Sequence, residues 1–293
     1  MTPKGNPRPK PLSREPPGLS FAPNPMTTLQ ALILGLVQGL TEFIPISSTA
    51  HLRLVPHFLG WADPGTAFSA VIQLGSLLAV FTYFAADLWK LILAALASLK
   101  YRNLNYNADA RLAWAICVGT LPISVLGLTF KDFIEGDARQ LTIIALALIV
   151  LALFLLLAER LGRRSRFMHE LGFWQIQLIG LCQALALVPG CSRSGSTIMG
   201  GLFLGLKREE AARFSFLLGL PAIGASGALE LLALLKEGLG EAGLFNLGVG
   251  IAAAAVSSYL AIGFLLRFLE RHGTHWFAYY RILLGLFILY SLS

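Results

Sequence analysis

The sequence contains few charged residues and few cysteines for its length. Of its 293 residues, 13% are charged and 3 are cysteine, whereas 56% are hydrophobic and the mean hydropathy is +0.69. A typical soluble domain carries about 25% charged residues. The composition therefore excludes an ordinary soluble protein and predicts one that lies in a lipid bilayer. Cys117, Cys182 and Cys191 have no metal-ligand spacing, and we expect three free thiols.

Acidic residues are scarcer than basic ones, and the formal net charge is +7. The Lys and Arg residues lie in short gaps between apolar runs. They neither form one stripe nor alternate with stacking aromatic residues, which argues against a nucleic-acid partner. Basic gaps of this kind are typical of cytoplasmic loops that contact anionic lipid headgroups, so the expected surroundings are membrane lipids.

The chain divides into a polar tail and one membrane domain. Residues 1–26 are rich in proline and basic residues and cannot bury a core, so we expect a disordered tail. No small-residue cleavage site follows the apolar stretch 29–40, which we interpret as retained rather than as a signal peptide. Residues 27–293 are predicted to form a single polytopic membrane domain.

Six apolar runs are long enough to cross a hydrocarbon core of about 30 Å as helices. They are residues 66–86, 111–131, 140–159, 211–235, 243–267 and 275–292. Two further runs, 27–57 and 172–206, are each interrupted by proline and a cluster of hydroxyl residues. Such an interruption predicts two half-helices around a site, because non-helical backbone at membrane depth is tolerated only against protein or a wet cavity.

The two interrupted runs resemble each other, which suggests an internal duplication. Gln38 lies seven residues before Pro45, and Gln183 lies six before Pro189. Each half then holds one broken hairpin and three spans, an odd number, so the second half is expected to be inverted relative to the first. The halves are about residues 27–160 and 171–293. The predicted fold is an all-α integral membrane protein with six transmembrane helices and two re-entrant hairpins in an inverted repeat.

Gln38 and Glu42 are four residues apart and share a helix face next to the first interruption. A carboxylate at membrane depth is costly and marks a functional site, where it pairs with a cation, a metal ion or a proton. The alternative is a satisfied hydrogen bond between helices.

Three hydroxyls and an imidazole follow Pro45 within about one helical turn: they belong to Ser47, Ser48, Thr49 and His51. Free N–H groups at a helix start form an anion site, although such residues can also serve as caps alone. His51 could act as a nucleophile, as a general base for a serine, or as a hydrogen-bond donor to phosphate.

The second interruption repeats this arrangement and adds a cation, Arg193. Gly190 allows close backbone approach, and the hydroxyl residues are Ser192, Ser194 and Thr197. A buried guanidinium calls for an anionic partner, and bidentate binding of phosphate is its best use. The alternative is a structural ion pair with Glu42.

Other polar residues of the spans carry less information. Gln73 can support the site or form a packing hydrogen bond between helices. Arg281 and Glu230 lie near the ends of spans, and we expect their charged groups to extend to the membrane surface.

On these residues the chain resembles the undecaprenyl-diphosphate phosphatase family linked to bacitracin resistance. The family's first motif corresponds to residues 38–42 followed by Pro45, Ser47, Ser48, Thr49 and His51, with Ala50 in place of a usual glycine. Its second motif corresponds to the whole run 189–197, and looser similarity covers nearly everything from about residue 27 onward.

The resemblance implies hydrolysis of undecaprenyl diphosphate to the monophosphate and inorganic phosphate. It also implies a divalent metal ion, Mg²⁺ or Ca²⁺, and a bacterial inner membrane, with the site open to the outer face.

Our hypothesis is that Ser48 attacks phosphorus with His51 as base or orienting donor, that Glu42 and Gln38 hold the metal, and that Arg193 clamps the phosphate. Direct attack by water or by His51 stays open. The competing hypothesis is a flippase or transporter of the lipid carrier, and the oligomeric state, a homodimer included, is left open.

Overall fold

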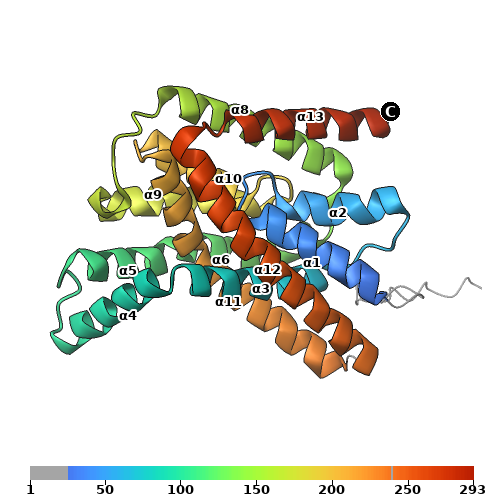
Figure 1. Cartoon of the computed structure of the whole chain (residues 1–293), viewed down its shortest axis with the longest axis horizontal. Coiled ribbons are helices and arrows are strands. Elements are labelled where there is room, and N and C mark those ends of the chain that lie inside the picture. The colour runs from blue at the N-terminus through green and yellow to red at the C-terminus, as the bar shows by residue number, and fades with distance from the viewer. Residues whose placement is uncertain (1–25, 239) are drawn as a thin grey trace, which may run out of the picture.

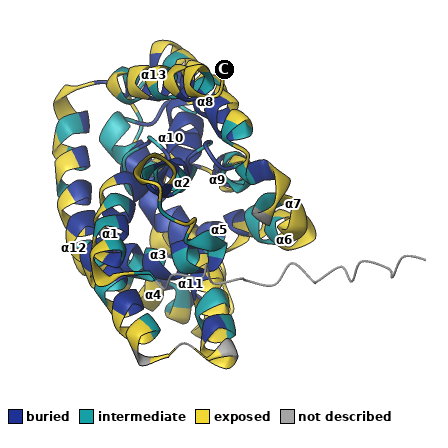
Figure 2. Ribbon diagram, turned by 90° about the vertical axis from the view of Figure 1, so that its right-hand side faces the viewer, coloured by how far each residue is buried: buried dark blue, intermediate teal, exposed yellow. Residues whose placement is uncertain are grey.

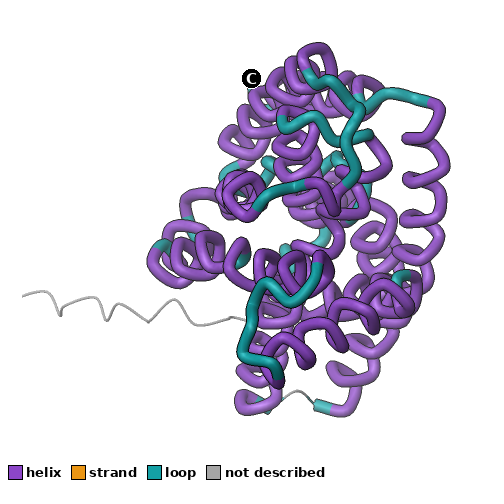
Figure 3. Tube along the Cα trace, turned by 90° about the vertical axis from the view of Figure 1, so that its left-hand side faces the viewer, coloured by secondary structure: helices purple, strands orange, loops and turns teal. Residues whose placement is uncertain are grey.

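The computed structural model describes residues 26–238 and 240–293, and within these residues the chain is almost entirely helical (Figure 3). Extended pairing in the described part is limited to one bridge between Arg166 and Leu206. The tail predicted for residues 1–26 lies outside the described residues except for Met26.

Thirteen α-helices and three short 3₁₀ turns (η) make up the described chain. The α-helices are α1 (Thr28–Glu42), α2 (Ser48–Leu59), α3 (Gly65–Tyr83), α4 (Ala85–Lys100), α5 (Ala108–Gly119), α6 (Leu121–Thr129), α7 (Lys131–Glu135), α8 (Leu141–Leu161), α9 (Phe173–Ala184), α10 (Arg193–Phe203), α11 (Arg208–Glu237), α12 (Glu241–Arg271) and α13 (His275–Ser291). The 3₁₀ turns are η1 (Asp137–Arg139), η2 (Met168–Glu170) and η3 (Leu185–Leu187).

Five segments of the described chain are long and apolar enough to cross a membrane: α3, the pair α5–α6, α8, α11 and α12. These correspond to five of the six predicted spans, and the protein is a multi-pass membrane protein. The sixth predicted span is α13, which has 17 residues and falls short of the 18 residues that the other spans reach.

Helix α4 was not predicted, because Lys90, Lys100, Arg102 and Arg111 made this stretch resemble a basic gap between two spans. The structure instead continues α3 into α4 with only Phe84 between them, and α4 then packs against α5. Figure 1 shows α4 and α5 side by side at one end of the molecule. The charges of α4 lie near its ends, Asp87 and Lys90 in the first two turns and Lys100 at the C-terminus, so the stretch between them remains apolar.

Helix α8 illustrates why the composition is so apolar. One face packs into the protein through buried residues such as Leu148 and Leu155, whereas the opposite face exposes Leu146, Leu153 and other large apolar side chains. A helix that is apolar on all sides is stable only where its outer face meets lipid.

The long helices surround the two interrupted runs, which form the helix pairs α1–α2 and α9–α10. Helix α12 crosses diagonally over α1, and α8 lies beside α13 (Figure 1). Small residues permit the first of these crossings, since a Cβ atom at Gly35 would lie 2.4 Å from the carbonyl oxygen of Gly250. Figure 2 shows the buried residues gathered around α1 and α10, with exposed residues on the outer helices. The broken segments therefore lie in the interior.

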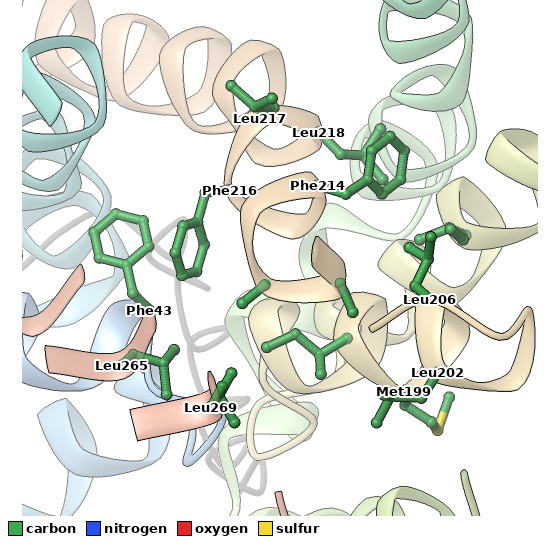
Figure 4. Packing of buried hydrophobic residues seen from close by; sticks show 14 of the residues in the cluster. Phe43, Met199, Leu202, Leu206, Phe214, Phe216, Leu217, Leu218, Leu265 and Leu269 are labelled. Carbon is green, nitrogen blue, oxygen red and sulfur yellow. The ribbon is translucent and has the colours of Figure 1, made fainter. Parts of the chain in front are cut away.

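The largest hydrophobic cluster holds in place the first break, which is the interrupted segment between α1 and α2. Phe43, the residue after α1, packs edge-on against Phe216 of α11, with the ring centroids 4.9 Å apart (Figure 4). Leu265 and Leu269 of α12 belong to the same cluster, as does Met199 of α10. The segment between α1 and α2 is thus fixed by apolar contacts as well as by its own hydrogen bonds.

Candidate active site

The first break separates α1 from α2. Pro45 has no N–H to donate, so α1 ends at Glu42 and a new helix begins at Ser48. Ser47 is the N-cap of α2: its side chain accepts a hydrogen bond from the N–H of Ala50, and its φ of 76° lies in the left-handed region. Helix α2 therefore starts inside the molecule, with the free N–H groups of a helix start at the break.

The second break, between α9 and α10, has the same local structure. Ser192 is the N-cap of α10, with a φ of 63°, and its side chain accepts a hydrogen bond from the N–H of Gly195. Ser47 and Ser192 each follow a fully buried glutamine, Gln38 and Gln183, by nine residues. This match pairs Pro45 with Gly190, one residue away from the pairing of prolines that the sequence suggests.

Glu42 is the centre of a buried hydrogen-bond network. Its Oε2 accepts from the Ser48 hydroxyl at 2.6 Å and from Nε2 of Gln38 at 2.8 Å, and its Oε1 lies 3.1 Å from Nη2 of Arg193. The ion pair with Arg193 is the one that the sequence offered as an alternative. The carboxylate thus joins the polar residues of both breaks.

The position of Arg193 depends on Gly219 of α11. A Cβ atom built on Gly219 would lie 1.1 Å from Nη1 of Arg193, so no larger residue fits beside the guanidinium. Nη1 is buried and finds no acceptor among the described residues. The guanidinium therefore has donor capacity left for an anionic ligand.

Of the remaining predicted hydroxyl residues, some line a cavity and others form hydrogen bonds within the protein. Thr49 and Ser192 line a cavity. Ser194 instead donates to the carbonyl of Ile44 in the other break at 3.3 Å, and Thr197 bonds to the Ser215 hydroxyl of α11 at 2.5 Å. Ser47, Ser194, Thr197 and Gly190 are not among the residues that line this cavity.

The cavity has a volume of about 520 Å³ and is polar at one end and largely apolar along its length. Glu42, Ser48 and Arg193 form the polar end. Residues of α6 and α11 form the apolar walls, and Gln73 of α3 also lines the cavity. Lys131 and Glu230 line it too, and their charged groups lie 3.5 Å apart. This shape suits a ligand with a charged head and an apolar tail. Glu230 is thus an ion-paired residue of the cavity wall.

The structure does not bring the ring of His51 to the Ser48 hydroxyl. His51 Nδ1 donates to the carbonyl oxygen of Ser47 at 2.7 Å, and Nε2 lies 2.7 Å from the Tyr280 hydroxyl. The two rings are nearly parallel, with centroids 5.8 Å apart. His51 lies outside the lining of the cavity, so its contacts in this structure orient the backbone at the start of α2.

The expectation for Arg281 is wrong. Its side chain is completely buried, and its guanidinium donates to backbone carbonyls in both breaks rather than extending to the membrane surface. A lone arginine in an apolar run looks the same to sequence analysis in either case. Its position in the helix could have indicated burial. Arg281 lies six residues after His275, which begins α13, and that is a long distance for a side chain to extend along a helix to the membrane surface.

Gln38 and Glu42, next to the first break, hold oxygen atoms of the kind that bind a divalent cation, although only Glu42 of the two lines the cavity. Oε1 of Gln38 is buried and finds no hydrogen-bond donor among the described residues, and the Glu42 carboxylate lies beside it. No group of three or more His, Cys, Asp or Glu residues in the described chain could hold a metal alone. These donors fit Mg²⁺, which binds through one or two carboxylates together with phosphate oxygens of a substrate. The three cysteines are free, as predicted.

Fold and site together define a multi-pass membrane protein with a buried Ser–Glu–Arg cluster at the end of an apolar cavity. Comparison with known proteins identifies its family: residues 31–287 match the family described as bacitracin resistance protein BacA, and the chain belongs to it. The undecaprenyl-diphosphatase of Chloroherpeton thalassium is 49% identical over 276 residues, covering 92% of this chain and 98% of the relative. That of Myxococcus xanthus is 50% identical over 268 residues, covering 92% and 90%.

Proposed function

We propose that this chain hydrolyses undecaprenyl diphosphate to undecaprenyl phosphate and inorganic phosphate, which recycles the lipid carrier for cell-wall synthesis and confers resistance to bacitracin. Its family and the names of its relatives support this reaction. The observation that carries it is the hydrogen bond from Ser48 to Glu42 beside Arg193 at the inner end of an apolar cavity. A transporter of the same lipid needs an anion clamp but no hydroxyl bonded to a carboxylate.

Ser48 is the nucleophile in this proposal, and Glu42 is its base. As Oγ attacks the terminal phosphorus, Glu42 accepts the hydroxyl proton across the 2.6 Å hydrogen bond. The new Oγ–P bond replaces the bond from phosphorus to the bridging oxygen, and Glu42 gives the proton to the departing undecaprenyl phosphate. Water then attacks the phosphoserine, loses a proton through Glu42 to Ser48 Oγ, and releases inorganic phosphate.

Arg193 holds the transferred phosphoryl group. Its ion pair with Glu42 opens when the diphosphate enters, and its Nη1, which has no acceptor among the described residues, supplies a second donor. Thr49 and Ser192 line the same end of the cavity and contribute hydroxyls. Ser47, Ser194, Thr197 and Gly190 shape the two helix starts, whose N–H groups complete the anion site.

Glu42 and Gln38 would hold a Mg²⁺ or Ca²⁺ ion, in keeping with the unpaired Oε1 of Gln38. When bound, the ion neutralises charge on the diphosphate and polarises the phosphorus for attack. His51 keeps the backbone of Ser47 in its left-handed conformation through the 2.7 Å bond to the Ser47 carbonyl.

We also infer an inverted repeat with the site open to the outer face of the inner membrane. The charge pattern assigns the basic gaps to the cytoplasm and the gaps that carry Asp132, Glu135 and Asp137 or Glu237 and Glu241 to the outside. Polar contacts join loops that lie on the same side in this assignment. At the outer end, Asn246 bonds to Thr28 and Met26, and Arg139 bonds to Asp63. The contacts at the cytoplasmic end are Glu159 with Arg208 and Thr274, Asp87 with Arg213, and Met168 with Glu210. Lys131 and Glu230, which line the cavity, belong to the outer set, so the cavity extends from the site toward that face.

Phosphate release from undecaprenyl diphosphate by the detergent-solubilised chain tests the reaction. We expect release with Mg²⁺ or Ca²⁺, loss of release after chelation, and no release from Ser48→Ala. A parent protein that releases no phosphate with any divalent metal, yet moves the labelled lipid between leaflets of proteoliposomes, would replace the phosphatase by the transporter. Undiminished release after chelation would remove the metal from the proposal and leave the reaction intact.

A further inference from the structure

Arg281 is the largest fully buried side chain of the described residues. It belongs to α13, and within the described chain its guanidinium forms no ion pair with a carboxylate. Its hydrogen bonds run to four backbone carbonyls instead: those of Leu148 at 3.2 Å, Pro45 at 3.2 Å, Gly190 at 2.8 Å and Cys191 at 3.2 Å. A cation is therefore buried at the point where the two breaks meet.

Two of these carbonyls occupy the same place in the two halves of the chain. Pro45 lies two residues before the cap Ser47, and Gly190 lies two residues before the cap Ser192. Nη1 donates to the first and Nη2 to the second, so one planar group joins equivalent points of both breaks. The carbonyl of Leu148, which accepts from Nε, ties the guanidinium to α8.

Burying a charge without a countercharge is costly, and here the cost is offset by hydrogen bonds to four backbone carbonyls that an apolar residue would leave without a donor. The backbone that Arg281 contacts is itself strained: Ser47 and Ser192 have left-handed φ values, which persist only where the surroundings impose them. The guanidinium supplies directional bonds that an apolar side chain cannot.

The approach of Arg281 to α10 depends on a missing side chain. A Cβ atom at Gly195, in the first turn of α10, would lie 2.8 Å from Nη1 of Arg281. Gly195 also donates its N–H to the cap Ser192. The guanidinium thus packs directly against the helix start that the phosphate is proposed to use.

We propose that Arg281 is a positioning residue for phosphoryl transfer: it locks the two breaks together so that Ser48 and Glu42 of one break face Arg193 of the other. Arg281 does not touch the substrate in this arrangement, and it does not line the cavity. The inference rests on the proposed phosphatase reaction for its kinetic consequence but not for its structural one.

The kinetic test compares Arg281→Met and Arg281→Lys with Arg271→Met, a control at the exposed end of α12. Because misplacement of reacting groups by 1 Å costs about 100-fold in rate, we expect kcat of Arg281→Met to fall by about 100-fold or more with KM changed less than about threefold. Arg281→Lys keeps the charge but can bridge the breaks less fully, so its kcat should lie between. Guanidinium ion, but not methylammonium, should partly restore kcat of Arg281→Ala. The control should match the parent.

The structural test uses Cys191, the half-buried thiol whose own carbonyl Arg281 binds. With Cys117 and Cys182 replaced by serine, Cys191 is the single reporter of this break. If Arg281 holds the break closed, a small maleimide should modify Cys191 about tenfold faster in Arg281→Met and Arg281→Lys than in the parent.

Two results would overturn the proposal. Turnover of both Arg281 variants within about threefold of the parent would show that the breaks keep their geometry without the guanidinium. Lost turnover with unchanged Cys191 labelling would show that Arg281 acts otherwise than by holding the break. If Arg281→Met does not fold, the Arg281→Lys pair of measurements decides the same question. An inactive parent would contradict the proposed function. The labelling comparison would still test whether Arg281 holds the two breaks together.

Discussion

Replacing Gly219 by alanine should displace Arg193 without altering any residue that contacts the substrate. The new Cβ would lie 1.1 Å from the present position of Nη1, and ordinary carbon contacts require about 3.5 Å. The guanidinium must therefore move by about 2 Å. Such a shift breaks the 3.1 Å contact between Arg193 and Glu42 and removes the clamp from the phosphate.

The size of the effect follows from what such an arginine contributes. Arginines that stabilise a transferring phosphoryl group are worth about 10³ to 10⁵ in kcat, so a displaced one should cost about 10² to 10³, or about 3 to 4 kcal/mol of the barrier. The preference of a helix for alanine over glycine, about 1 kcal/mol, offsets only part of the stability lost with the buried Arg193–Glu42 pair, so a modest fall in melting temperature should accompany the loss of turnover.

The assay is phosphate release at saturating lipid together with a thermal melt. Gly224→Ala is the matched control: it lies on the same helix, and its Cβ would meet only Leu77 at 3.6 Å, an ordinary contact. In an Arg193→Ala background, Gly219→Ala should have little further effect, because both changes remove the same group. Equal turnover of the Gly219 and Gly224 variants would refute the placement of Arg193 as the clamp.

Three further predictions concern the first break and the loop after α2. Ser48→Ala should abolish turnover with lipid binding retained, and an active Ser48→Ala would refute the nucleophile. Ser47→Gly should be milder than Ser47→Ala, because glycine accepts the left-handed φ. As a cap, glycine costs only a few tenths of a kcal/mol, against about 1 kcal/mol for alanine. His51→Asn keeps a donor near the Ser47 carbonyl and should retain more kcat than His51→Ala, and two equally inactive variants would instead support His51 as base or nucleophile. Burial raises the pKa of Asp63, but the hydrogen bond and the charge of Arg139 lower it by more. The net pKa of Asp63 therefore lies below its usual value. The stability from this pair is therefore full above about pH 5, where Asp63 is ionised in the folded and the unfolded chain. It is lost as pH falls through the folded pKa, so melting temperatures of the parent and Asp63→Asn should differ at neutral pH and converge as the pH drops below that pKa.

The sequence by itself determined the class of fold and the positions of the two breaks whose polar residues form the candidate site. Long runs without charge require lipid, and Pro45 ends a helix wherever it lies. A carboxylate such as Glu42 or a guanidinium such as Arg193 is too costly in an apolar run unless it is paired or has a function. These are local properties of composition and spacing, so they can be predicted without coordinates.

Tertiary structure alone decided which of these groups meet. The hydroxyl of Ser48 lies against Glu42 rather than His51, and the ring of His51 is directed toward Tyr280 on α13, far away in sequence. Arg281 resembles any arginine near a span end until α13 places it between the two breaks. Such contacts depend on how helices distant in the chain pack together, and hydrophobic periodicity specifies only which face of a helix is buried, not its neighbour.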